Sequence, residues 1–209
     1  MQYPELEAFE EEARAVEDTL AGMSEDAWER PGLGEWSVAE LVAHLVRAVT
    51  RVDAYLDVEV DAAQPVVDRV GYWRFDLVAE APAIAARARE EADGVEPGVL
   101  VQRFTEGWQA SATRAGALGP DHLLATLRGP MRLDEYLATR VLELVVHHLD
   151  LRAALDQPPA GTPRAERLTM QLLESLLGGP RPRNFGRQRF VRAATGRLAV
   201  DDPRFPVLR

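Results

Sequence analysis

Residues 133–151 constrain the fold more than any other stretch of this chain. Written as a helix at about 100° per residue, the segment is apolar almost all the way round. Leucine and valine fill two broad sides of it: Leu137, Val141, Leu144 and Val145 on one, and Leu142, Val146 and Leu149 on the other. A helix that is apolar on every side is normally surrounded by other elements. The pattern therefore predicts a central helix in a helical domain.

One narrow stripe of this helix is polar. Arg140, Glu143, His147 and Asp150 fall within about 80° of one another on the helical wheel. Ionisable side chains on a buried helix are costly unless they are paired or bind a cation. Glu143 and His147 are four residues apart, so their side chains project side by side, as two ligands of one metal ion must. The stripe therefore predicts a metal site or an internal salt network.

The remaining periodicity predicts an all-α bundle. Four long helices are expected, at residues 4–20, 38–58, 97–118 and 133–151. Ser37 and Glu40 have the spacing of a capping box, which places the start of the second helix at residue 38. Shorter helices are expected at residues 66–80, 82–92, 163–177 and 185–194, and a strand or extended crossing at residues 122–127. Strands and helices do not alternate, so a parallel nucleotide-binding sheet is not expected.

A proline-rich linker at residues 158–161 divides the chain. We expect a helical bundle at residues 1–157 and a short, helical and irregular extension at residues 158–209. From residue 161 onward the chain has ten arginines and four acids, a charge of +6. Because the whole chain has a net charge of −10, residues 1–160 carry −16. Opposite charges predict that the basic extension packs on the acidic bundle.

Composition excludes several classes of function. The net charge of −10 argues against nucleic acid as a partner. No apolar run is long enough to cross a bilayer and the acidic N-terminus lacks the layout of a signal peptide, so we expect a soluble, cytoplasmic protein without a membrane partner. Cysteine is absent. Any thiol chemistry must therefore use a thiol from outside the chain.

His44 is the best candidate for a third metal ligand. It lies on the shoulder of the second predicted helix, whereas His122 lies outside the long helices and His148 points about 100° away from His147. Two imidazoles and a carboxylate leave a fourth position for water or substrate, as in catalytic zinc sites. Nickel, iron or manganese accept the same ligands. One turn away on either side, Asp150 is placed to accept an imidazole N–H and Arg140 to hold a carboxylate.

Simpler interpretations stay open for each residue. Glu-x-x-x-His on a helix is often only a polar pair. Arg140, Glu143 and Asp150 could form a buried ion-pair ladder without a metal. The tryptophans Trp36 and Trp108 are expected to be core or loop anchors.

Two motifs resemble the mycothiol-dependent maleylpyruvate isomerase family of the DinB-like superfamily. Residues 34–45, Gly-Glu-Trp-Ser-Val-Ala-Glu-Leu-Val-Ala-His-Leu, are similar to the family's Gly-x-Trp-Ser/Thr-Val segment before a helix with a ligand histidine. Residues 140–151 are similar to its Arg-x-x-Glu-x-x-x-His-x-x-Asp-Leu segment. The resemblance covers roughly residues 5–157 and implies a DinB-like four-helix metal-binding bundle. The isomerase also carries a separate α/β domain, whereas only about fifty residues follow the bundle here.

The resemblance implies a site and a chemistry. His44, Glu143 and His147 match the family's ligands for a divalent metal, usually zinc. Mycothiol would be the co-substrate, bound through its sulfur and favoured there as the thiolate. In the isomerase the thiolate adds to the double bond of a cis-enedione-type acid, the resulting single bond rotates, and sulfur leaves. Related members transfer the thiol to other electrophiles.

Three hypotheses follow. The first is a metal-dependent isomerase or transferase that uses mycothiol and acts on a small electrophile. The second is a non-catalytic bundle that binds a metal or small ligand in a stress response. The third is a structural protein with a salt network in place of the metal. A homodimer is compatible with all three, and the sequence does not decide it.

Overall fold

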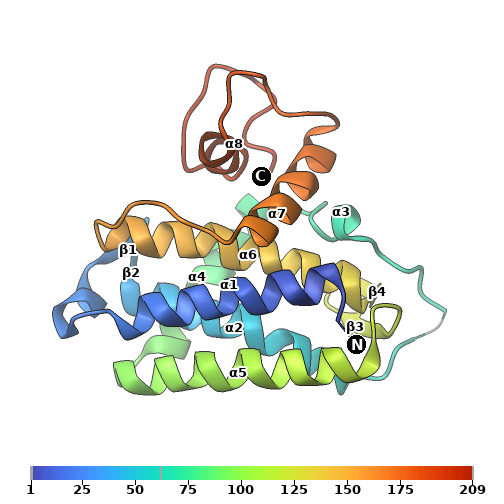
Figure 1. Cartoon of the computed structure of the whole chain (residues 1–209), viewed down its shortest axis with the longest axis horizontal. Helices are drawn as coiled ribbons and strands as arrows, with labels where there is room; N and C mark the ends of the chain where they lie inside the picture. Colours follow the sequence, from blue (N-terminus) through green and yellow to red (C-terminus); the bar gives the residue numbers. More distant parts are fainter. Residues whose placement is uncertain (1, 62, 209) are drawn as a thin grey trace.

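Four long helices form the body of the protein in a computed structural model that describes residues 2–61 and 63–208. They are α1 (Pro4–Ala21), α2 (Val38–Leu56), α5 (Pro97–Leu118) and α6 (Leu133–Ala154). Helices α1 and α2 each contact both α5 and α6, so the four close into a bundle (Figure 1). The all-α bundle predicted from the sequence is confirmed, and the expected bounds of the four helices are correct to within three residues.

Helix α6 is the most buried element, as its apolar circumference predicts. Sixteen of its 22 residues are buried, including the ionisable Arg140, His147, His148 and Asp150. Helix α2 begins at the predicted capping box: the Ser37 hydroxyl accepts from the Glu40 N–H, and the Glu40 carboxylate accepts from the Ser37 N–H. The box fixes the start of the helix that carries His44.

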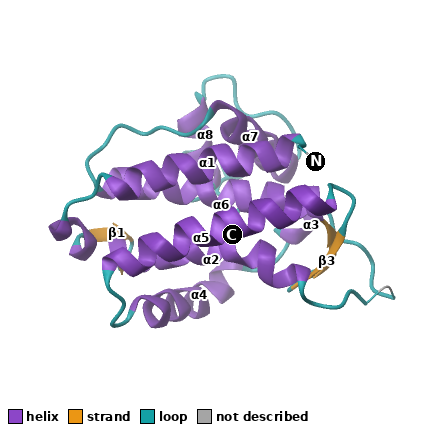
Figure 2. Ribbon diagram, turned by 60° about the horizontal axis from the view of Figure 1, so that its bottom comes forward, coloured by secondary structure: helices purple, strands orange, loops and turns teal. Residues whose placement is uncertain are grey.

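The expected helix at residues 66–80 is wrong. Only a single turn, α3 (Arg69–Tyr72), lies there, and a longer helix, α4 (Leu77–Ala92), follows it. Asp76 caps α4 by accepting a hydrogen bond from the Ala79 N–H, a cap that the apolar periodicity does not reveal. Pro82 lies inside α4 on an exposed face and does not end it, so the expected division into separate helices at residues 80 and 82 is also wrong. Helix α4 packs against α2 on the outside of the bundle (Figure 2).

Two short antiparallel hairpins lie at opposite ends of the bundle (Figures 1 and 2). Strands β1 (Pro31–Leu33) and β2 (Trp36–Ser37) follow a 3₁₀ turn, η1 (Glu25–Glu29), and lead directly into α2. Strands β3 (Leu123–Thr126) and β4 (Gly129–Arg132) pair in register from Leu123 opposite Arg132 to Thr126 opposite Gly129 and lead into α6. The strand expected within residues 122–127 is thus confirmed.

The C-terminal segment places α7 (Pro163–Leu177) against α1 and α6, followed by α8 (Arg187–Ala194). Arg164 forms ion pairs with Glu7 and Glu11 of α1, joining the basic segment to the acidic bundle. Met1 and Arg209, the ends of the acidic N-terminal segment and the basic tail, lie outside the described residues. In the part of the chain that is described, no helix is long and apolar enough to span a membrane.

Candidate metal centre

Three side chains converge where α2 packs against α6. His44 comes from α2, and Glu143 and His147 come from α6. The Nε2 atoms of His44 and His147 lie 3.4 Å and 3.1 Å from Oε2 of Glu143. One donor atom from each residue can be chosen so that all three lie within 4.8 Å of one another. The structure therefore brings together the three residues proposed as ligands.

Asp150 fixes the orientation of the His147 ring. Its Oδ2 accepts a hydrogen bond from Nδ1 of His147 at 3.0 Å. A neutral His147 ring with its proton on Nδ1 would present the lone pair of Nε2 on the side of Glu143. Arg197, from the C-terminal segment, donates to both carboxylate oxygens of Asp150, with Nη2 2.8 Å from Oδ2. The C-terminal segment thus supports a proposed ligand of the bundle.

Burial and hydrogen bonding set the charges of this group. Burial lowers the pKa of His44 and outweighs its hydrogen bond with Glu143. Burial alone would raise the pKa of Glu143, but the His147 and His44 rings hold that pKa well below its usual range. Burial also opposes ionisation of Asp150, yet hydrogen bonds from His147 and Arg197 lower its pKa to about 2. Both carboxylates are therefore ionised at neutral pH, the form in which carboxylates bind metals.

An apolar cavity of about 200 Å³ opens onto all three residues. Its other walls come from β2, the end of α3, α4, α6 and the C-terminal segment: Trp36, Trp73, Leu77, Ala81, Ile84, Leu142, Val146, Arg197 and Leu208. The Trp36 ring lies 5.2 Å from the His44 ring between centroids. Trp36 is buried, as expected of an anchor, and also forms a wall of this cavity. A small molecule in the cavity would touch the three side chains directly.

Arg140 lies one turn from Glu143 and is buried. Its Nε donates to Oγ1 of Thr139 at 3.1 Å and its Nη2 to Oη of Tyr72 at 3.3 Å. The guanidinium lies 4.9 Å from the ring centroid of Tyr136. Arg140 forms no ion pair with any described residue. The sequence predicted that it holds a carboxylate, and no carboxylate of the described residues fills that role.

The other two histidines lie away from the centre. His148 faces α1, where its Nδ1 lies 2.7 Å from Oε1 of Glu12 and its Nε2 lies 2.9 Å from Oγ1 of Thr19. His122 is exposed just before β3. Trp108 is buried in α5 and donates its Nε1–H to Glu17, the role of a core anchor.

Sequence reasoning missed two contributors to this centre. Arg197 follows α8 in an irregular segment and binds Asp150 of the bundle. The only sequence signal for this contact was the net positive charge of the C-terminal segment. The cavity walls from α4 were missed because the bounds of that helix were misplaced.

The donor set fits a divalent metal. Two imidazole nitrogens and a carboxylate oxygen suit zinc and its neighbours in the first transition row. Metal-binding imidazoles usually donate their other ring N–H to a carboxylate, and Asp150 is that carboxylate for His147.

A family model described as "Mycothiol maleylpyruvate isomerase N-terminal domain" matches residues 9–152, more than half of the 209-residue chain. The chain belongs to this family. Membership makes it a mycothiol-associated protein with a metal-binding, DinB-like bundle. His44, Glu143 and His147 all lie within the matched residues, whereas Arg197 lies beyond them. No curated protein and no solved structure gives a significant match.

Proposed function

We propose that this protein is a divalent-metal-dependent enzyme that uses mycothiol to isomerise a small electrophile or to transfer the thiol to it. His44, Glu143 and His147 hold the metal, with zinc as the first choice and nickel as an alternative. The observation that carries the proposal is the convergence of these three donors beside an apolar cavity. Family membership supports the choice of thiol.

The number of ligands favours a catalytic site over a structural one. Three protein donors leave a coordination position open, whereas structural zinc sites are usually closed by four. A divalent metal there would favour the thiolate form of a bound thiol. The chain has no cysteine of its own to compete for that position.

The surrounding residues have separate roles. Asp150 positions His147 through Nδ1, and Arg197 holds Asp150. Trp36, Leu142 and Val146 contribute apolar wall and limit the access of water to the three donors. Arg140 supplies positive charge one turn from Glu143 for an anionic group of the substrate.

Elemental analysis of the purified protein is the first test. We expect about one divalent metal per chain and its loss in the variants His44→Ala and Glu143→Gln. Wild-type protein with no bound metal after exposure to zinc would contradict the proposal and favour a salt network of these residues.

The second test measures turnover. Zinc-loaded protein is incubated with mycothiol and monochlorobimane, and the conjugate is followed by fluorescence. Maleylpyruvate, the substrate in the family's name, is assayed for isomerisation in parallel. We expect a rate above the thiol blank that disappears in His44→Ala. A metal-loaded protein with no turnover on several electrophiles would instead favour the non-catalytic binding bundle.

A further inference from the structure

A second hollow, a cleft of about 100 Å³, lies beside the metal centre and shares His44 and Glu143 with it. Its walls come from α2, α3, α4, the β3–β4 turn and α6. They carry five arginines, namely Arg47, Arg51, Arg87, Arg128 and Arg140. We call this hollow the arginine cleft. Two acids, Glu80 and Glu143, line it as well, so its lining side chains sum to a positive charge.

Most of this charge is not neutralised by the protein. Arg47 pairs with Glu91 at 2.7 Å and Arg128 pairs with Glu80 at 3.4 Å. Arg51, Arg87 and Arg140 form no ion pair with any described residue. Arg140 is only 6% exposed, and a buried guanidinium without a counter-ion is costly. Glu143, one turn along α6, is also a proposed metal ligand, so its charge would be shared with the metal.

Unpartnered hydrogen-bond donors gather in the same walls. Among the described residues, five buried side-chain polar atoms have no hydrogen-bond partner, and three of them belong to residues of the arginine cleft. These are Nε1 of Trp73, Nε of Arg87 and Oη of Tyr136. The first two can only donate and the third can donate. Buried donors of this kind normally have an acceptor, and no acceptor in residues 2–61 and 63–208 reaches these three.

We propose that the arginine cleft binds a carboxylate of the electrophilic substrate, with Arg51, Arg87 and Arg140 as its binding residues. The inference rests on the proposed function, because His44 and Glu143 line both hollows and so place the bound carboxylate next to the reacting centre. A carboxylate only accepts hydrogen bonds, and guanidinium groups bind it with charge-assisted bonds. These three arginines would therefore select an electrophile that carries a carboxylate over an uncharged one.

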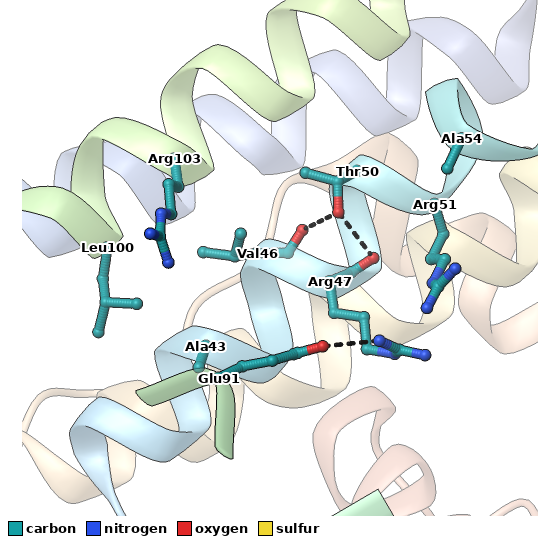
Figure 3. Close-up of a pocket in the computed structure, with 9 residues that line it drawn as sticks. All are labelled: Ala43, Val46, Arg47, Thr50, Arg51, Ala54, Glu91, Leu100 and Arg103. Carbon is teal, nitrogen blue, oxygen red and sulfur yellow. Dashed lines mark hydrogen bonds and ion pairs between the residues drawn. The ribbon is translucent and has the colours of Figure 1, made fainter. Parts of the chain in front are cut away.

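A neighbouring hollow supplies the control. It has a volume of about 290 Å³, lies between α2, α4 and α5, and is also lined by Arg47 and Arg51 (Figure 3). Arg103 lines only this hollow and is exposed, whereas Arg87 lines only the arginine cleft. Arg87→Gln and Arg103→Gln are therefore matched single changes that tell the two hollows apart.

The first experiment is direct binding to the zinc-loaded full chain by calorimetry, with succinate as the probe and dimethyl succinate as its uncharged counterpart. We expect succinate to bind and the diester not to bind. Arg87→Gln and Arg51→Gln should each weaken succinate binding about tenfold, the order expected from losing a charge-assisted hydrogen bond. Arg103→Gln should bind like wild type. Circular dichroism and zinc content verify that the variants are folded and loaded.

Two outcomes of the binding experiment overturn the inference. Equal binding of succinate and its diester would show that charge is not recognised. A loss of succinate binding in Arg103→Gln but not in Arg87→Gln would place the anion in the other hollow. Neither outcome depends on turnover, so the anion site can fail while the proposed function stands.

A second experiment uses thiol transfer to a charged and an uncharged electrophile. With iodoacetate or iodoacetamide, a carbon–sulfur bond forms, the carbon–iodine bond breaks, iodide leaves and the thiol proton goes to solvent. Relative to the blank, we expect kcat/KM to favour iodoacetate, Arg87→Gln to remove this preference, and Arg103→Gln to keep it. An unchanged preference in Arg87→Gln would contradict the inference, whereas no turnover with either reagent would count against the proposed function.

Discussion

Asp150 links the bundle to the C-terminal segment at the scale of single residues. It accepts from His147 on its own helix and from Arg197 on a segment 47 residues later. Its side chain is only 8% exposed, so its charge depends on these two partners. Removing that charge weakens the orientation of the imidazole without changing any of the three proposed metal ligands.

We expect Asp150→Asn to lower zinc affinity by about 10- to 100-fold, the usual cost of losing such a partner. Competition titration with a zinc-binding dye measures the affinity. Asp121→Asn is the matched control because that carboxylate is 80% exposed and pairs only with a surface arginine. Unchanged zinc affinity in Asp150→Asn would show that Asp150 does not position His147.

The candidate ligands could be predicted because their signal is local. Glu143 and His147 stand one turn apart on a helix whose bounds are clear from apolar periodicity, and His44 has a defined place on another. Arg197 and Arg87 carry no such signal. Their roles depend on how an irregular tail and an outer helix fold back on the bundle, which periodicity does not encode.

At the scale of elements, the β1–β2 hairpin sets the position of α2. A Cβ on Gly32 would lie 2.7 Å from the carbonyl oxygen of Ser37, the N-cap of α2. Gly34 has a φ of +58°, in the left-handed region that favours glycine. The close approach leaves no room for a side chain at residue 32. Trp36 lies in β2 between Gly34 and Ser37, so the tight hairpin holds its ring beside the ring of His44.

We expect Gly32→Ala to lower the free energy of unfolding by about 1–3 kcal/mol, because the methyl group meets backbone that cannot move freely. Urea denaturation gives this value, and zinc affinity should fall as α2 shifts. Gly98→Ala is the control, since a Cβ there meets nothing within 4 Å and the residue lies in a helix. Equal stability of Gly32→Ala and wild type would contradict the tight fit.

A second element-scale contact gives a pH dependence. Arg69 of α3 binds Glu135 of α6 through two side-chain hydrogen bonds, at 3.0 Å and 2.8 Å. Burial opposes ionisation of Glu135, but Arg69 lowers its pKa below the ordinary value of 4.5. A carboxylate whose pKa is lowered by folding stabilises the protein above its unfolded pKa, and this contribution is lost as the pH falls through the folded pKa.

We therefore expect wild type to exceed Glu135→Gln in unfolding free energy by a constant amount at neutral pH. The difference should shrink as the pH falls below about 4.5. Chemical denaturation of both proteins across this range measures it, and taking the difference cancels the other carboxylates. A difference that grows toward low pH would have the wrong sign.

At the scale of the whole molecule, a buried network joins α1, α6 and the start of α7. Glu12 is fully buried, and its Oε1 lies 2.7 Å from Nδ1 of His148. Its Oε2 accepts from both the backbone N–H and the hydroxyl of Thr162, the N-cap of α7. One carboxylate thus ties the C-terminal segment to the bundle.

We expect Glu12→Gln to loosen α7 before the rest of the protein, because an amide presents a donor where Glu12 only accepts. Hydrogen exchange should speed up in residues 163–177 and stay slow in α2 and α5, with a loss of about 1–3 kcal/mol in local stability. Glu10→Gln is the control, because the Glu10 carboxylate pairs with Arg14 of its own helix, α1. Uniform acceleration across all helices would show that the network supports the core and not α7 alone.

The apolar cavity and the arginine cleft are neighbouring hollows that share His44, Trp73, Ile84 and Glu143 in their linings. In the proposed function, the two hollows together offer room for a thiol and an electrophile at the same time. Such an arrangement calls for a ternary complex, and double-reciprocal plots of initial velocity at several thiol concentrations should intersect. Parallel lines would mean that one reactant leaves a group on the protein before the other binds, and would contradict simultaneous binding.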